Sequence, residues 1–254
     1  MVRLITYNLQ YFEGTTKNML QYFDLYHVFR EKKSIEMKML EFISRYNPDV
    51  LSLVEIDSGS KRVGRKDELK RFSERLGLEF VAHSIKYAKT GFFKIFRVLP
   101  FFKNQENAIL SKKKLKDVKY HYLHKGSKRV VIEASIGERN ITFFVVHLAL
   151  FRKARLKQIK DLKKLLSEKK KPYIVVGDFN SFIKEELDIL KEGSDLVDAY
   201  DVALQSGKDR NTTPSWNPRY PLDNVLVSND LVVKKYEVLD AHFSDHLPVL
   251  VDIE

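Results

Sequence analysis

Six short polar clusters stand at the ends of apolar, strand-like runs of this sequence. The runs are rich in β-branched and large apolar residues, a pattern typical of strands that are covered on both faces. In chain order, the clusters contain Asn8, Glu55, His147, Asp178 with Asn180, Asp223, and Asp245 with His246. One such cluster alone is usually a turn that caps a strand. Six of them within 254 residues predict polar side chains that meet where the core opens to a cleft.

The residue types in these clusters suit the hydrolysis of a phosphoester. That reaction needs stabilised charge on the non-bridging oxygens, an activated water and a neutralised leaving oxygen. Hard oxygen ligands favour Mg²⁺ or Mn²⁺, and the sequence has no cysteine that would supply a thiolate ligand. Glu55 is the first choice as metal ligand, because it is the lone carboxylate at the tip of an otherwise apolar run. A bound cation would polarise the phosphoryl oxygen and assist the leaving group.

Taken together, the motifs resemble the endonuclease/exonuclease/phosphatase superfamily over nearly the whole chain. Its members include pancreatic deoxyribonuclease, abasic-site endonucleases, neutral sphingomyelinases and inositol polyphosphate 5-phosphatases. The motifs that carry the resemblance are Thr6-Tyr7-Asn8, Glu55, Asn107-Ala108-Ile109-Leu110-Ser111, His147-Leu148, Gly177-Asp178-Phe179-Asn180, Asp223 and Ser244-Asp245-His246. The resemblance implies an α+β fold: a four-layer α/β/β/α sandwich of two packed mixed β-sheets, with helices outside and the site at one end. It does not select a substrate, because the members share this core and differ in their loops.

The resemblance also implies roles at the metal and at the attacking water. Asn8 and Asp245 are expected to be neighbours of Glu55 at the cation. Asp178 is expected to orient or deprotonate the water, and Asn180 to hold the phosphate. Asp178 and Asn180 stand two apart after a glycine, so on extended backbone their side chains point to the same side.

Two histidines complete the implied site. His246 is expected to contact the phosphate or to act as acid–base, with Asp223 hydrogen-bonded to its other ring nitrogen. His147 is paired with a carboxylate in two branches of the superfamily. Glu106 supplies that carboxylate if the deoxyribonuclease branch is followed, whereas many small bacterial relatives have glycine there, and both interpretations stay open. No Gly-x-Ser-x-Gly motif is present, which disfavours a serine nucleophile.

Three further residues are candidates for substrate binding. Arg129 begins a predicted strand, where it either touches a substrate phosphate or is a solvated cation. Asn107 is a candidate because it opens one of the family motifs. Trp216 lies in a loop framed by two prolines, where it stacks on a base, touches a lipid or anchors the loop. Gln10 stands where the abasic-site branch carries an acid, which argues against a dedicated abasic-site repair enzyme.

Composition and charge limit the classes of protein and partner. The absence of cysteine excludes disulfides and a cysteine nucleophile. No stretch approaches the roughly 18 apolar residues of a membrane span, and the absence of a charged-then-apolar leader predicts a cytoplasmic protein. The net charge of +11 favours an anionic partner, with nucleic acid first. Nothing in the sequence implies a protein partner.

The segment from Lys86 to Lys103 interleaves aromatic and basic residues. It contains five phenylalanines, including Phe92 and Phe102, among basic residues such as Arg97. This mixture suits an anionic membrane surface, and it equally suits stacking on unpaired bases with phosphate contacts. Packing of the aromatic rings into the core is the remaining interpretation.

Helical and strand patterns alternate along the chain. Helices are predicted over 34–45, 67–76 and 152–166, with Ser34 capping the first and Gly77 ending the second. Strands are predicted over 130–136 and 141–146, on either side of a hairpin-like turn. No repeat or low-complexity linker divides the chain, which predicts a single domain over 1–254.

The leading hypothesis is an Mg²⁺- or Mn²⁺-dependent phosphodiesterase that acts on nucleic acid by direct attack of water. A phospholipid phosphodiesterase of the sphingomyelinase kind or a phosphoinositide phosphatase is the alternative, from the Phe-rich basic segment. A non-catalytic anion-binding module belongs to a different class. It is disfavoured because the metal and acid–base positions are all occupied by suitable residues.

Overall fold

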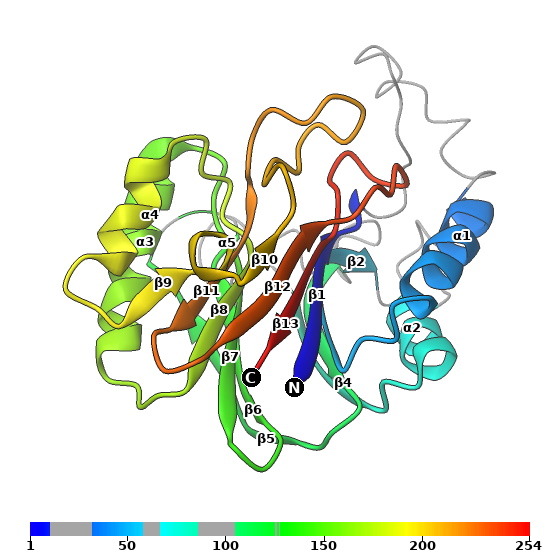
Figure 1. Cartoon of the computed structure of the whole chain (residues 1–254), viewed down its shortest axis with the longest axis horizontal. Helices are drawn as coiled ribbons and strands as arrows, with labels where there is room; N and C mark the ends of the chain where they lie inside the picture. Colours follow the sequence, from blue (N-terminus) through cyan, green and yellow to red (C-terminus); the bar gives the residue numbers. More distant parts are fainter. Residues whose placement is uncertain (11–31, 58–66, 86–104, 125, 127) are drawn as a thin grey trace.

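Two β-sheets pack face to face between two layers of helices, which gives the α+β sandwich that the sequence predicts (Figure 1). The computed structural model describes residues 1–10, 32–57, 67–85, 105–124, 126 and 128–254. The Phe-rich basic segment, Lys86 to Lys103, lies outside the described residues, so none of its three interpretations is tested.

Seven strands of the described chain form the first sheet, in the order β10-β12-β13-β1-β2-β4-β3. They are β1 (Val2–Asn8), β2 (Val50–Asp57), β3 (Phe80–Ile85), β4 (Gln105–Ser111), β10 (Gln205–Ser206), β12 (Val233–Val238) and β13 (Val249–Ile253). β1 pairs parallel with β2 and antiparallel with β13. The first and last strands therefore lie side by side in the middle of this sheet, as Figure 1 shows.

Six strands within the described ranges form the second sheet, in the order β5-β6-β7-β8-β11-β9. They are β5 (Leu115–Tyr122), β6 (Val130–Ile136), β7 (Ile141–His147), β8 (Tyr173–Asp178), β9 (Leu196–Asp198) and β11 (Asp223–Ser228). β7 and β8 are parallel, and β11 runs antiparallel to β8.

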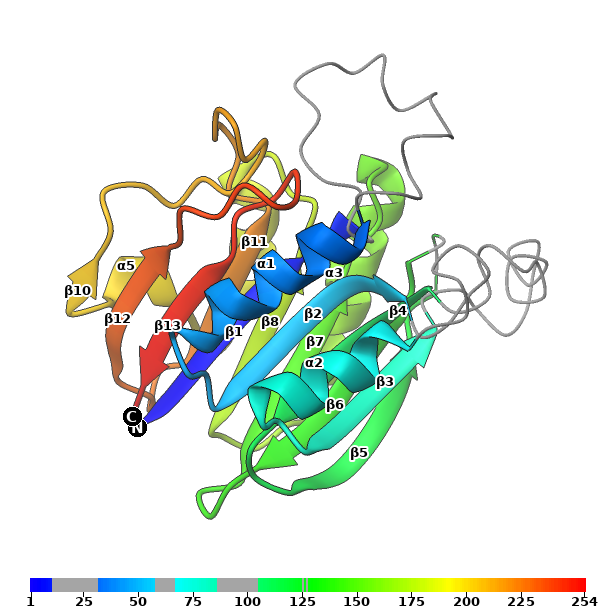
Figure 2. The same ribbon diagram turned by 90° about the vertical axis from the view of Figure 1, so that its right-hand side faces the viewer.

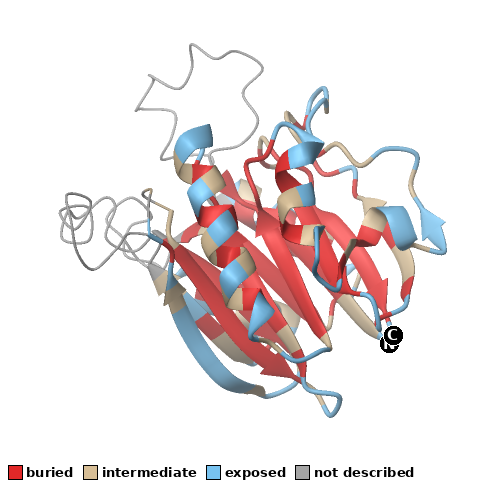
Figure 3. Ribbon diagram, turned by 90° about the vertical axis from the view of Figure 1, so that its left-hand side faces the viewer, coloured by how far each residue is buried: buried red, intermediate tan, exposed pale blue. Residues whose placement is uncertain are grey.

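Helices cover the outer faces of both sheets. α1 (Lys32–Ser44) and α2 (Glu68–Leu76) lie over the first sheet, as Figure 2 shows. α3 (Arg152–Ser167) and α4 (Lys184–Lys191) lie over the second, and the short α5 (Ala199–Val202) follows β9. Figure 3 shows that the helices over the second sheet bury their inner faces and expose their outer ones. No helix in the described part of the chain is long and apolar enough to cross a membrane.

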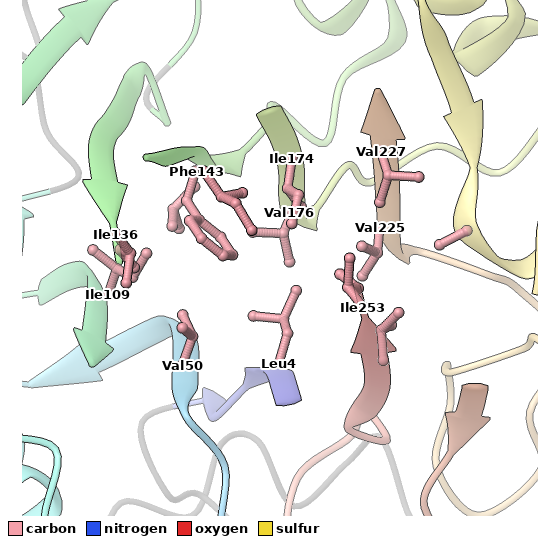
Figure 4. Close-up of a cluster of buried hydrophobic side chains, with 14 of the residues drawn as sticks. Leu4, Val50, Ile109, Ile136, Phe143, Ile174, Val176, Val225, Val227 and Ile253 are labelled. Atoms are coloured by element: carbon pink, nitrogen blue, oxygen red, sulfur yellow. The ribbon is translucent and has the colours of Figure 1, made fainter. Parts of the chain in front are cut away.

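Apolar side chains fill all three spaces between the layers. Leu4, Val176 and Ile253 belong to the core between the two sheets, which Figure 4 shows in close-up. Val175, the neighbour of Val176 on β8, packs on the other side of the sheet with Leu162 of α3. Successive residues of the strand thus pack alternately between the two sheets and against the helices, and both surroundings are apolar. This double burial explains why the strands read as continuous apolar runs.

The predicted helices and the two hairpin strands agree with the structure except at one helix start. Asp67 caps α2 by accepting a hydrogen bond from the Lys70 backbone at 2.9 Å, and Gly77 ends it in the left-handed region at φ 64°. The strand predictions correspond to β6 and β7. α1, however, begins at Lys32. Ser34 therefore lies inside the first turn and does not cap the helix, which corrects the prediction.

Candidate active site

Strand register brings the polar clusters to one end of the sandwich. Along β7, β8 and β11, His147 is the register partner of Asp178, and Asp178 is the register partner of Asp223. In the first sheet, Asn8 and Asn107 flank the same residue of β2. Directly paired residues share a face. Val145, Val176 and Val225, each two positions along the strand from one of the three residues in the second sheet, line the core between the sheets. The three side chains therefore face the space between the sheets.

Gly177 allows β8 to approach β7 at this end. Its φ of 135° lies in a region that glycine alone adopts readily, and a Cβ there would stand 2.1 Å from the Val146 carbonyl oxygen. Any side chain would therefore collide with backbone that cannot move independently. The glycine thus keeps His147 and Asp178 in register at the strand ends.

Asp178 is the buried centre of the site. Its Oδ2 accepts hydrogen bonds from Asn8 Nδ2 at 3.1 Å and Asn180 Nδ2 at 3.0 Å, and it lies 3.3 Å from His147 Nε2. Its Oδ1 accepts the backbone N–H of Asn180 at 2.8 Å. Burial raises the pKa of Asp178, but the adjacent His147 and the positive charges of His246 and Lys128 outweigh burial and lower the pKa. The group is therefore a carboxylate at neutral pH.

Asn180 reaches Asp178 through a tight turn, not along an extended strand. β8 ends at Asp178, and Asn180 has a left-handed φ of 49°. Asparagine tolerates this conformation better than most residues. The extended geometry expected from the sequence is therefore wrong, although the two side chains do meet. The amide of Asn180 also donates to the Leu148 carbonyl at 2.9 Å.

Glu55 sits at a β-bulge and not at the end of its strand. β2 continues to Asp57, and its register with β4 shifts around Glu55, which has a φ of 59°. Bulges of this kind redirect a side chain next to a functional site. Glu55 Oε1 lies 3.9 Å from His147 Nε2 and 3.4 Å from Lys128 Nζ. The Glu55 side chain is 15% exposed, whereas the Asp178 side chain is 1% exposed.

His246 and Asp223 form a buried charged pair. His246 Nδ1 lies 2.6 Å from Asp223 Oδ2, which also accepts a hydrogen bond from Thr212 Oγ1 at 2.7 Å. Burial lowers the pKa of His246, but Asp223, with help from Asp178 and Asp245, outweighs burial and raises it to about 10. His246 is therefore an imidazolium at neutral pH. With Nδ1 held by Asp223, Nε2 lies 4.0 Å from Asp245 Oδ1.

Asp245 is the second carboxylate that reaches solvent. Its side chain is 26% exposed. Burial, reinforced by the Glu55 carboxylate, raises its pKa to about 6. Its loop is fixed to the end of β1, because Ser244 Oγ donates to the Asn8 carbonyl at 2.7 Å and Gln10 Oε1 accepts the Asp245 N–H at 3.3 Å. Two carboxylates that repel one another, as Glu55 and Asp245 do, are an arrangement that a divalent cation relieves.

The donor set fits a hard divalent cation. Glu55, Asp245 and the carboxamide of Asn8 offer oxygen ligands only, as Mg²⁺ and Mn²⁺ prefer. Asn107 Oδ1, on the adjacent strand, is buried and has no hydrogen-bond partner within the described structure. No three acidic or imidazole side chains of the described residues form a ready metal cluster. The ligand roles therefore stay predictions.

His147 is a neutral imidazole with unexpected partners. Burial, followed by the positive charge of Lys128, lowers its pKa to about 4. Its Nε2 contacts Lys128 Nζ, Asp178 and Glu55, while Nδ1 is buried without a partner in the described part of the chain. Glu106 does not pair with His147; its carboxylate contacts His83 of β3. The deoxyribonuclease-like pairing is therefore not formed.

Lys128 enters the site where Arg129 was expected. Lys128 continues the alternation of Val130 and Ile132, which face the core between the sheets. Arg129 has the opposite parity, and its Nε donates to the Leu123 carbonyl. The sequence shows two adjacent cations, Lys128 and Arg129, before this strand. It does not indicate which of them faces the site, because both faces of β6 are apolar.

Trp216 lies in a loop attached to the site. Its neighbour Ser215 donates through its backbone N–H to the Asp245 carbonyl at 2.8 Å and through Oγ to the Ser244 carbonyl at 2.6 Å. Trp216 itself is 39% exposed. The loop thus places an exposed indole next to the strand-end residues, and its role in substrate binding stays a prediction.

A buried ion pair holds the loop that carries Asn180. Glu186 of α4 accepts hydrogen bonds from Arg155 Nε of α3 at 2.6 Å, from Arg152 Nε at 3.0 Å and from Ser181 Oγ at 3.0 Å. Arg155 also donates to the Leu150 carbonyl at 2.5 Å. The two loops that follow β7 and β8 are therefore fixed to each other.

Glu186→Gln is expected to lower the free energy of unfolding by about 3 kcal/mol at pH 7, since it leaves a buried guanidinium uncompensated. Burial raises the pKa of Glu186, but Arg155 outweighs it and lowers the pKa. The stabilisation is therefore full above the unfolded-state pKa and disappears as pH falls through the folded-state value. Urea denaturation should show a difference between the variants that narrows below about pH 4. Glu74→Gln, in an exposed pair at 3.8 Å from Lys70, should cost less than about 0.5 kcal/mol. If the difference in unfolding free energy between wild type and Glu186→Gln did not change with pH, the stabilisation could not come from the ion pair of Glu186 with Arg155.

Comparisons with known proteins agree with this architecture. The model of the Endonuclease/Exonuclease/phosphatase family matches residues 5–246. Among solved structures, a mannosyl-6-phosphatase from Bacteroides thetaiotaomicron is 17% identical with a TM-score of 0.71, and all of both chains is covered. Sphingomyelinase C from Streptomyces griseocarneus is 13% identical with a TM-score of 0.68, and 98% of each chain is covered. Among curated proteins, no significant match was found.

A humanized TDP2 from D. rerio is similar as well, at 12% identity and a TM-score of 0.68, with 100% of this chain and 98% of that chain covered. At such low identity these likenesses show the shared fold and not a shared substrate.

Proposed function

Because the chain belongs to the endonuclease/exonuclease/phosphatase family, whose members generally hydrolyse phosphoesters, we propose that it is a divalent-cation-dependent phosphodiesterase acting on nucleic acid. The observation that carries this proposal is the buried convergence on Asp178. That carboxylate contacts Asn8 from the first sheet and His147 from the second, next to the His246–Asp223 pair. Such a cluster of perturbed acids and imidazoles at a strand end is typical of a catalytic site.

The proposed reaction is direct attack of water on phosphorus. Glu55, Asp245 and Asn8 would hold Mg²⁺ or Mn²⁺, which supplies polarisation of a phosphoryl oxygen and neutralises the leaving oxygen. Asp178 orients the water and accepts its proton as the new O–P bond forms and the bond to the leaving oxygen breaks. The His246 imidazolium donates from Nε2 to a phosphoryl oxygen, which stabilises the charge that develops there.

Asn180 has a different role in this proposal from the one the sequence suggested. Its Nδ2 donates to both Asp178 and the Leu148 carbonyl, so both amide hydrogens have acceptors within the protein. We therefore assign Asn180 to positioning Asp178. The phosphate is left to the cationic groups of the site.

The net charge of +11 supports nucleic acid as the substrate class, since phosphate contacts dominate the affinity for nucleic acid. One observation supports the lipid phosphodiesterase or phosphoinositide phosphatase as second candidate. Near the site, Phe151 is 81% exposed, and Phe182, Ile183 and Trp216 are also exposed, next to Arg152 and Lys184. Exposed apolar side chains among cations suit an anionic membrane surface.

An activity panel with Mg²⁺ or Mn²⁺ tests the proposal. It compares duplex DNA, single-stranded DNA, RNA, sphingomyelin, phosphoinositides and bis-p-nitrophenyl phosphate. Hydrolysis of a nucleic acid is expected with either cation, and EDTA should abolish it until the cation is restored. Glu55→Gln should raise the Mg²⁺ concentration for half-maximal activity by about tenfold or more, because a charged ligand is lost. Preference for a lipid would select the second candidate, and hydrolysis that persists in EDTA would refute the cation dependence.

A further inference from the structure

Lys128 brings an ammonium group into the middle of the site. Its Nζ lies 3.4 Å from Glu55 Oε1 and in contact with His147 Nε2. An ammonium has three N–H donors, and no other partner of Nζ occurs within the ranges that the structure describes. The side chain is 20% exposed. One donor direction is therefore left for a group that enters the site from solvent.

The backbone of Lys128 is held in place by α3. The buried side chain of Gln158 donates from Nε2 to the Lys128 carbonyl at 2.6 Å, and its Oε1 accepts the Ala149 N–H at 2.7 Å. Gly126 makes room for this bridge, since a Cβ there would stand 2.7 Å from Gln158 Nε2. Lys128 is thereby fixed beside the end of the strand that carries His147.

Lys128 and His246 are the cationic side chains that contact the acids of the site among the residues that the structure describes. Four carboxylates gather here, namely Glu55, Asp178, Asp223 and Asp245, and they face the positive charges of Lys128 and His246. A divalent cation would bring the sum of these charges to zero. Without Lys128 this sum over the described residues would be negative even with the cation bound, which would disfavour an anionic phosphate.

We propose that Lys128 is a phosphate-binding residue: it holds Glu55 while no divalent cation is bound, and it turns its ammonium to a non-bridging oxygen of the substrate once the cation takes its place. This inference rests on the proposed function and names the group that binds the phosphate in the same site. In the free protein Lys128 neutralises Glu55, so it competes with the cation. In the loaded protein it is a positive charge on the β6 side of the site, whereas His246 comes from the loop before β13.

Two binding measurements on the whole protein test this inference. Mn²⁺ binding is followed by electron paramagnetic resonance without substrate, and inorganic phosphate binding by calorimetry in Mg²⁺. Lys128→Met is expected to bind Mn²⁺ about fivefold more tightly, because a competing charge is gone, and phosphate about tenfold more weakly. Lys128→Arg should keep both affinities within about threefold. Lys116→Met, an exposed lysine at the opposite end of the second sheet near the turn at Asn140, should change neither.

The opposite signs separate this role from a structural one. If Lys128→Met weakened the binding of both Mn²⁺ and phosphate, and Lys128→Arg restored neither affinity, Lys128 would be a structural residue and the inference would be overturned. Phosphate affinity within twofold of wild type would overturn it as well. If the wild-type protein binds no Mn²⁺ at all, the proposed function fails first, and that outcome is visible before any variant is compared. In turnover, Lys128→Met should raise KM more than it lowers kcat, whereas a misfolded site would lower kcat.

Discussion

Asp178→Asn is expected to lower kcat by about a thousandfold or more while the protein stays folded. The substitution keeps the size of the side chain but removes the charge and the ability to accept a proton from water. It also breaks the pattern of hydrogen bonds. Asp178 accepts donors at both oxygens, from Asn8, the Asn180 side chain and the Asn180 backbone. An amide must turn its own NH₂ toward one of these donors.

Steady-state kinetics on the substrate that the panel identifies, together with circular dichroism and a urea titration, would check this prediction. Glu133→Gln is the matched control, because Glu133 is also a buried acid of the second sheet. It pairs with Lys169 at 2.6 Å on the outer side of β6, away from the cluster. We expect its kcat to stay within about threefold of wild type. A kcat for Asp178→Asn within tenfold of wild type would remove Asp178 from the reaction.

The strands could be predicted from the sequence because both of their faces are buried. A strand between another sheet and a helix layer has no polar face, so β6, β7 and β8 read as apolar runs. The polar residues at their tips are then conspicuous, and strand register alone aligns His147, Asp178 and Asp223. The same reasoning gives the position of these residues but not their partners.

What the sequence did not predict depends on backbone conformation and face. Glu55 adopts a φ of 59° at a bulge, and glutamate carries no signal for that conformation. The sequence does not distinguish Lys128 from Arg129, because a strand with two apolar faces does not indicate which of its residues face the other sheet. Glu106 meets His83 because the register of β3 and β4 makes them diagonal neighbours.

Contacts from a distant loop were equally invisible. Thr212 donates to Asp223 at 2.7 Å from a segment that does not belong to either sheet. Ser215 holds the Ser244–Asp245 loop. Hydroxyl residues in a polar loop carry no pattern that separates such a contact from solvent exposure. The position of the loop follows only from the finished packing of the two sheets.

His246→Gln is expected to lower kcat by about a hundredfold or more, with a smaller effect on KM. The imidazolium is lost, and with it a charged donor toward the phosphoryl oxygen, whereas glutamine retains only a neutral donor. The same kinetic assay measures this, and Thr212→Val is the comparison that leaves both members of the pair in place. It removes one hydrogen bond to Asp223 and should cost less than about tenfold.

Asp223 maintains the positive charge on His246. A substitution of Asp223 tests the importance of that charge while His246 itself stays in place. Since Asp223 raises the pKa of His246 against the effect of burial, Asp223→Asn should bring that pKa down. The kcat of the wild-type protein should then stay constant up to a higher pH than the kcat of Asp223→Asn. The reason is that the imidazolium persists to about pH 10 only while the Asp223 carboxylate is present. The alkaline fall in activity should move to lower pH in Asp223→Asn, and lowering the pH should recover part of its activity. If the alkaline fall in activity stayed at the same pH in Asp223→Asn, the proton on His246 would take no part in the reaction. If His246→Gln raised KM and left kcat unchanged, the histidine would serve substrate binding alone.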